Sequence, residues 1–156
     1  MNKQEFADRV TGLRMRLYRV AILYTGREAA AIEAVDEAVY RGLKALPTLR
    51  EPDYFDTWIT RILINECKKE LRRRKKEILA EALPETAQEA YDALPLKEAV
   101  LRLPTALKEV ILLRFFADYT LAETARCLRT PQGTIVTRQR RALRLLRLAL
   151  EEEESV

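Results

Sequence analysis

The chain has 156 residues, of which 48% are hydrophobic and 33% are charged, a composition typical of a folded protein and not of a disordered one. It carries 28 lysines and arginines against 24 aspartates and glutamates, and it has no histidine, which excludes histidine-based acid–base chemistry and argues against a zinc site. Glycine is scarce, strong helix formers dominate, and no apolar run has the period of two that strands require. The sequence therefore predicts an all-α fold.

Several function classes find no support in the sequence. Cys67 and Cys127 lie far apart and match no metal-ligand spacing, so we expect two buried thiols in a reducing cytoplasm. The chain has no glycine-rich phosphate loop and no catalytic carboxylate motif, and its first 25 residues hold no continuous apolar stretch for a signal or membrane helix. We expect a cytoplasmic protein that is not an enzyme, binds no metal, cofactor or small-molecule substrate, and does not insert into a membrane.

Apolar residues at three- and four-residue steps predict three helices in the first half, at residues 2–24, 28–46 and 54–76. Gly26 ends the first helix and Pro47 the second. The core stripe expected for the second helix consists of Ile32, Val35, Val39, Leu43 and Leu46. Three amphipathic helices of this length predict a small bundle.

Charge divides the chain into three parts. Residues 1–76 and 96–156 are net basic, whereas residues 77–95 carry five acidic side chains and no basic one. This division predicts two domains joined by an acidic linker that stays away from any polyanion the domains bind. The alternative is a solvated helix that happens to be acidic.

The second half is expected to form a four-helix domain ending in a helix-turn-helix, with helices at residues 96–103, 106–117, 121–128 and 134–151. Thr120 and Glu123 have the spacing of a capping box at the start of the third of these helices. Pro131 and Gly133 mark the tight turn before the last helix. The four consecutive glutamates near the end are unfavourable at a helix C-terminus, so we expect that end to fray.

The last helix is the first candidate DNA-binding element. A recognition helix presents its first two turns to the major groove, where arginine and threonine contact bases and phosphates. The residues expected to do so are Thr134, Val136, Thr137, Arg138, Arg140, Arg141 and Arg144. The alternative is an arginine-rich solvated face, which the preceding turn makes the weaker interpretation.

The third helix is the second candidate, because its basic residues share one face. That face is Arg61, Asn65, Lys68, Lys69, Arg72 and Arg73. Tyr54 and Trp58 lie near its start, and aromatic rings beside a basic face suit the unstacked bases of an opened strand. For Trp58 we favour the alternative, a core anchor. For the basic residues the alternative is a solvated helix end favoured by the helix dipole, and we favour nucleic-acid binding.

The second helix has a different character, since acidic residues lie beside Tyr40 and Arg41. Asp36 and Glu37 are the nearest of these acids. Such a face suits a protein contact, and from the residues alone a solvated face is equally consistent.

The sequence resembles the extracytoplasmic-function group of bacterial RNA polymerase sigma factors. The more specific match is "LPTALKEVILLRFFADYTLAETARCLRTPQGTIVTRQRRAL", which is similar to the promoter-reading domain of that group. The N-terminal match is "AIEAVDEAVYRGLKAL" followed by "FDTWITRILINECKKELRRRKK", with Phe55, Trp58, Arg61 and Asn65 at the family's spacing.

The resemblance implies a function for each helix. The second helix would dock on the clamp helices of the polymerase largest subunit, where Val35, Asp36, Glu37 and Tyr40 match. The third helix and the "PTLREPD" loop would open and read the −10 promoter element, and the last helix would read the −35 element beside the polymerase flap. The implied partners are core RNA polymerase, promoter DNA and an anti-sigma factor.

The sequence departs from the family pattern at three positions. Asp36 stands where the group usually has glutamine, Val136 where a basic residue is common, and Gln139 where an apolar residue is common. The polymerase contact and the promoter that the last helix reads are therefore expected to differ from the usual ones.

Two other functions are alternatives to the sigma factor. A stand-alone helix-turn-helix regulator would need a dimer interface to span two half-sites, and the sequence has no heptad seam for one. A scaffold that only binds an anti-sigma factor would have no need of the arginines in the last helix.

Overall fold

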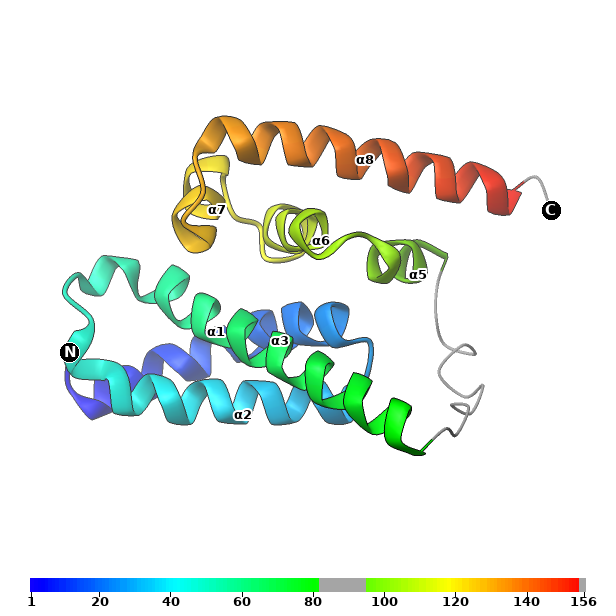
Figure 1. Cartoon of the computed structure of the whole chain (residues 1–156). Helices are drawn as coiled ribbons and strands as arrows, with labels where there is room; N and C mark the ends of the chain where they lie inside the picture. Colours follow the sequence, from blue (N-terminus) through cyan, green and yellow to red (C-terminus); the bar gives the residue numbers. More distant parts are fainter. Residues whose placement is uncertain (82–94, 155–156) are drawn as a thin grey trace.

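The computed structural model describes the backbone of residues 1–81 and 95–154, and this part of the chain is made of helices and turns without a strand. The predicted all-α fold is therefore confirmed. The helices form two bundles, which lie one above the other in Figure 1. Residues 82–94 of the predicted linker lie outside the described residues, so the domain boundaries at 76 and 96 stay predictions.

Helix α1 (Lys3–Thr25) begins and ends where its sequence indicates. Asn2 caps its start, since the side-chain oxygen accepts a hydrogen bond from the Glu5 amide at 2.8 Å. Gly26 ends it with φ 77°, the left-handed conformation that favours glycine. Its apolar side chains are mostly buried, with Phe6 and Leu17 among the core residues.

Helix α2 (Glu28–Ala45) turns a different face inward from the one predicted. Its buried residues are Ala31, Ala34, Val35, Ala38 and Gly42. The expectation that Ile32 and Leu43 lie in the core is wrong, because they are 45% and 39% exposed. Small residues let α2 approach its neighbours closely: a Cβ atom at Gly42 would lie 2.6 Å from Ile59 Cδ1. Close packing of the backbones therefore decides the orientation of α2.

The loop after α2 contains two short 3₁₀ turns, η1 (Leu46–Thr48) and η2 (Pro52–Tyr54), and leads directly into α3 (Phe55–Glu81). Helix α3 continues five residues past its predicted end at 76, so the start of the predicted linker is helical. The Phe55 ring is buried, with its centroid 5.8 Å from that of Trp58. Trp58 thus packs against the core, as favoured from the sequence.

The second bundle contains α5 (Pro95–Arg102), α6 (Thr105–Ile111), α7 (Leu121–Leu128) and α8 (Gln132–Glu154). The helix predicted at 106–117 is divided, since α6 passes into a π-helical turn, η3 (Leu112–Phe116). Val110, Leu113, Ile135 and Ala142 are fully buried between these elements.

The C-terminal end of α8 differs from expectation. The prediction that the glutamates fray is wrong, because the helix continues to Glu154. Arg147 Nε lies 3.2 Å from Glu151 Oε1 one turn later, and this pair offsets part of the unfavourable interaction with the helix dipole.

The two bundles pack against each other on one side. Helices α1 and α3 contact α5, η3 and α7, and buried apolar side chains of both bundles form one continuous core. Helix α8 lies on the outer side of the second bundle, away from α2 (Figure 1). Among the described helices, none combines the length and the apolar character needed to cross a membrane.

Candidate nucleic-acid interface

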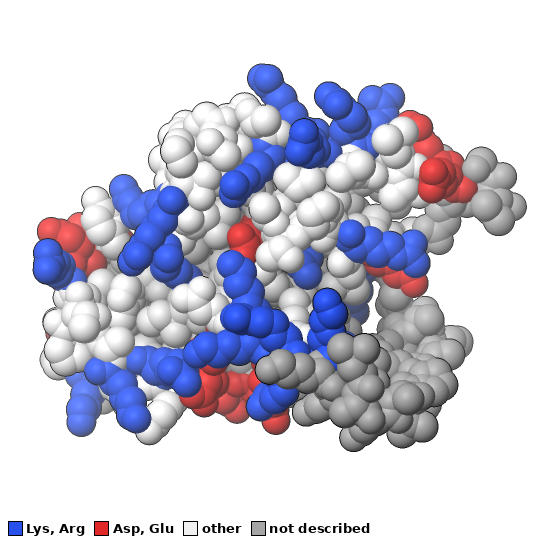
Figure 2. All heavy atoms as spheres, in the orientation of Figure 1, with Lys and Arg blue, Asp and Glu red and all other residues white. Residues whose placement is uncertain are grey.

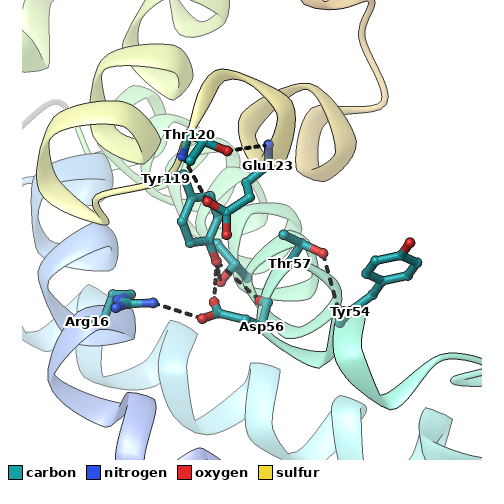
Figure 3. A network of polar contacts seen from close by, with 8 residues as sticks. Arg16, Tyr54, Asp56, Thr57, Tyr119, Thr120 and Glu123 are labelled. Atoms are coloured by element: carbon teal, nitrogen blue, oxygen red, sulfur yellow. Dashed lines mark hydrogen bonds and ion pairs between the residues drawn. The ribbon is translucent and has the colours of Figure 1, made fainter.

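Helices α7 and α8 form the predicted helix-turn-helix. The capping box at the start of α7 is confirmed, because Thr120 Oγ1 accepts from the Glu123 amide at 3.1 Å and Glu123 Oε1 accepts from the Thr120 amide at 2.9 Å (Figure 3). Arg129 ends α7 in the left-handed conformation with φ 50°. The Ile135 amide donates to the Pro131 carbonyl at 3.1 Å, which is the first α-helical hydrogen bond of α8. The helix begins at Gln132, so Gly133, predicted to lie in the turn before it, belongs to its first turn.

Helix α8 presents its basic face to solvent. Buried Ile135, Ala142 and Leu146 fix its inner side. The residues predicted to bind DNA lie opposite: Thr137, Arg140, Arg141 and Arg144 are exposed, and Thr134, Val136 and Arg138 are half-buried. Within the described residues these arginines form no ion pair, and lysines and arginines gather over α8 in Figure 2. The helix therefore offers unneutralised guanidinium groups to a polyanion.

Gln139, which departs from the family pattern, has a structural partner. Its side-chain oxygen accepts a hydrogen bond from Arg114 Nε at 2.9 Å, and the same guanidinium donates to the Tyr119 carbonyl at 2.6 Å. The apolar residue usual at this position would leave one donor of a half-buried arginine without a partner. Gln139 thus stabilises the contact between η3 and α8, and its side chain is directed toward η3 and not toward the basic face of α8.

Substituting Gln139 by leucine is expected to lower the free energy of unfolding by about 1–2 kcal/mol, because the Arg114 donor loses its acceptor. Gln139→Glu keeps an acceptor for Arg114 and is expected to change the free energy of unfolding by less than about 0.5 kcal/mol. Urea unfolding of both variants measures the difference. Equal stabilities would show that the hydrogen bond contributes nothing.

The residues of the basic face predicted on α3 differ in their environments, because some are exposed and others are paired with neighbouring residues. Asn65, Lys69 and Arg72 are exposed and border a groove of about 370 Å³. Arg73 is paired with Glu33 at 3.2 Å and with Glu70.

The other two residues of this face point toward the second bundle. Arg61 Nη1 donates to the Cys127 carbonyl at 3.3 Å, and Lys68 Nζ lies 2.8 Å from Glu109 Oε1. Burial, and secondarily the charge of Arg129, lowers the pKa of Arg61.

On α2, the predicted polymerase-binding residues do not all reach the surface. Asp36 is exposed, Tyr40 is 52% exposed, and Glu37 is half-buried with its carboxylate 3.1 Å from Arg41 Nε. Val35 is only 4% exposed, so its assignment as a contact residue is corrected: it packs in the core beneath this surface. Asp36 and Glu37 line a groove of about 610 Å³ between α2 and α3.

A polar network joins the bundles at Tyr119, a residue that no sequence motif singles out (Figure 3). Its hydroxyl lies 2.7 Å from Thr60 Oγ1 and donates to the carboxylate of Asp56, which also pairs with Arg16 at 2.8 Å. Tyr119 is 2% exposed, and burial together with the Asp56 hydrogen bond raises its pKa. The hydroxyl therefore stays protonated and can remain a donor.

A second network lies deeper. Glu109 is 7% exposed, and its Oε1 accepts from the Tyr24 hydroxyl at 3.0 Å besides pairing with Lys68. Lys108, which is also buried, donates to the Tyr24 carbonyl at 3.0 Å. Nothing in the sequence distinguishes these two charged residues from surface residues, because the surface that covers them comes from the other bundle.

The two cysteines, predicted to be buried thiols, are buried and not bonded to each other. Burial raises the pKa of each to about 12. Cys127 Sγ lies 3.6 Å from the Thr57 carbonyl of α3, so this thiol sits at the contact between the bundles.

Comparison with known families finds two matches, in the order of the bundles. Residues 10–77 match the family described as "Sigma-70 region 2", and residues 99–148 match "Sigma-70, region 4". RNA polymerase sigma factor SigV of Bacillus subtilis is 31% identical over 150 residues, which cover 93% of this chain and 90% of SigV. The ECF RNA polymerase sigma factor SigM of Mycobacterium tuberculosis is 29% identical, covering 85% of this chain and 71% of SigM.

Solved structures share the fold over nearly the whole chain. CnrH, solved in complex with the cytosolic domain of CnrY, superposes with a TM-score of 0.76 at 22% identity, covering 97% of this chain and 90% of CnrH. The sigma factor RpoE of Bartonella quintana, solved with the anti-sigma factor NepR, gives 0.78 at 21% identity, covering 95% of this chain and 98% of RpoE. The resemblance seen in the sequence is confirmed, and the chain belongs to the RNA polymerase sigma factors of the extracytoplasmic-function group.

Proposed function

We propose that this sigma factor divides promoter recognition between its two bundles. Helix α8 reads the −35 element, and α3 with the preceding loop holds the opened strand of the −10 element. The observation that carries the proposal is the row of exposed guanidinium groups on α8, held in a capped helix-turn-helix and not neutralised within the described residues. A sigma factor binds promoter DNA as a subunit of the polymerase, which holds the two bundles at the spacing of the two promoter elements.

The chain directs core RNA polymerase to promoters and aids their opening. We assign it no catalysis and no cofactor, because the synthesis of RNA belongs to the polymerase. Its place of action is the cytoplasm, where the polymerase transcribes.

Helix α3 holds bases that have already unstacked, and it does not catalyse the opening of the strands. Asn65 and Arg72 are exposed to phosphates and bases of a displaced strand, and Lys69 is exposed beside them although its ammonium pairs with Glu66 at 3.1 Å. Tyr54, 42% exposed at the start of α3, offers a ring on which an unstacked base can lie. Bases that unstack spontaneously are held there, which shifts the equilibrium toward the open promoter.

Docking on the polymerase is assigned to the outer surface of α2. Asp36 and Tyr40 are exposed there beside the apolar side chains of Ile32 and Leu43. An aromatic and apolar centre with charged neighbours has the composition of a protein interface. Val35 supports this surface from within.

An anti-sigma factor is the remaining partner we propose. The fold matches sigma factors that were solved with a protein partner bound, one of which is the anti-sigma factor NepR. Such a partner would act by occupying surfaces that the polymerase or the promoter needs.

Run-off transcription with purified core polymerase tests the function, on promoters identified by sequencing transcripts after overexpression. Adding the chain is expected to give initiation at those promoters and at no others. No promoter-specific initiation, combined with a palindromic footprint of the chain alone, would establish the stand-alone regulator instead.

A further inference from the structure

A cleft between the two bundles is lined by positive charge and aromatic rings. Its volume is about 260 Å³, and its walls are the loop before α3, the start of α3 and the end of α7. Among the described residues that line it, Glu51 is the only acid. The arginines and aromatic residues of the cleft are Arg50, Arg61, Arg126, Arg129, Tyr54 and Trp58.

The four arginines of this cleft are not neutralised. None of them forms an ion pair within the part of the chain that the structure describes, whereas Arg41 and Arg73 in the groove between α2 and α3 are paired with glutamates. Burial, and after it the charge of Arg129, lowers the pKa of Arg61, so these two guanidinium groups are close enough to repel each other. An anion bound between them would replace repulsion with charge-assisted hydrogen bonds.

The aromatic side of the cleft suits a planar ring. Tyr54 is 42% exposed and Trp58 is half-buried, and the Tyr54 ring points away from the Tyr119 network (Figure 3). The Arg126 guanidinium lies over the Tyr54 ring, with its central carbon 3.8 Å from the ring centroid. Stacking uses the face of a guanidinium and leaves the N–H donors at its edge, so Arg126 is held in place and can still donate to a phosphate.

We infer that this cleft binds a free nucleotide, with its base against Tyr54 and Trp58 and its phosphates on the surrounding arginines. A nucleotide combines the planar ring and the negative charge that the two sides of the cleft suit. Small-molecule pockets usually measure about 300–1,000 Å³, so a cleft just below that range has room for one nucleotide and not for a longer strand.

The ligand is an effector, additional to the partners of the proposed function, although Arg61 and Tyr54 take part in both. Arg126 and Arg129 come from α7 and the other lining arginines from the first bundle, so the site is complete only where the bundles meet. A nucleotide within a DNA strand has the same chemistry as a free one, and the test separates these two sources.

Fluorescence of Trp58 reports on the cleft directly, because it is the only tryptophan of the chain. We expect ADP and GDP to quench this fluorescence to saturation, and isothermal titration calorimetry to give the same dissociation constants. Adenosine lacks the phosphates and inorganic pyrophosphate lacks the ring, so each is expected to bind at least about tenfold more weakly.

Substitutions in α7 test the arginines without changing α3 or α8. Arg126→Gln combined with Arg129→Gln is expected to weaken ADP and GDP binding by about tenfold or more. The matched control is Arg14→Gln combined with Arg102→Gln, which makes the same change in net charge at exposed positions of α1 and α5 outside the cleft, and should change binding by less than about twofold. Arg50→Gln, in the exposed loop, is expected to weaken binding by about threefold or more, and it decides the matter if circular dichroism shows the α7 variant to be unfolded.

Four results would overturn the inference. They are neither quenching nor heat with ADP and GDP, an equal loss of affinity in the control variant, pyrophosphate binding as tight as that of ADP, and binding of a fluorescein-labelled single strand of mixed sequence without binding of ADP or GDP. The last would assign the cleft to a DNA strand. Run-off transcription separates this inference from the proposed function: promoter-specific initiation without nucleotide binding leaves the sigma function intact, and nucleotide binding without initiation leaves the effector site intact.

Discussion

Replacing Arg138 and Arg141 by alanine together is expected to reduce promoter-specific initiation by about 100-fold or more while core-polymerase affinity stays unchanged. Both side chains lie on the first turns of α8, the part of a recognition helix that enters the major groove. A bidentate arginine–guanine contact contributes about 1–3 kcal/mol of discrimination, so the loss of two such contacts has the stated size. Run-off transcription gives the initiation rate, and a labelled-core binding assay gives the affinity.

Arg147→Ala is the matched control for these arginines. Arg147 is exposed on the same helix, but it is paired with Glu151 and lies beyond the turns that reach the groove. Its loss is expected to change initiation by less than about threefold. A collapse of core affinity in the Arg138 and Arg141 variant would contradict the assignment, since it would mean that these arginines serve docking or folding.

Features encoded by short stretches of sequence were predicted accurately. The ends of α1 depend on Asn2 and Gly26, and the start of α7 depends on Thr120 and Glu123 three residues later. Such caps act within one turn, so neighbours in the sequence are sufficient to identify them. The buried stripe of α8 likewise follows from its own periodicity.

Features that depend on distant residues were missed. Periodicity placed Ile32 in the core, but the small residues of α2 pack more closely against α1 and α3 and turn it outward. Tyr119 and Asp56 are 63 residues apart, and Lys108 and Glu109 look like surface charges until the first bundle covers them. The contacts between α3 and the second bundle are thus a property of the packed bundles, which no local pattern encodes.

The second large effect is expected on α2, where Asp36→Arg combined with Tyr40→Ala should weaken binding to core polymerase by about 30-fold or more. Both side chains are exposed, so the substitutions are expected to lower the stability of the fold only slightly. Truncation removes an aromatic side chain at the centre of the proposed interface, and the reversed charge opposes whatever cation Asp36 faces. A fluorescence binding titration with labelled core enzyme measures the change.

Asp8→Arg provides the control for charge, because Asp8 is also exposed but belongs to α1 and not to the proposed docking surface. It makes the same change in net charge and is expected to leave core affinity within about twofold. Duplex DNA binding by the Asp36 and Tyr40 variant should equal that of the wild type, since α8 lies on the other bundle. Unchanged core affinity in that variant would refute the α2 assignment and direct the search for the docking surface to the groove between α2 and α3, where Glu33 and Glu70 remain.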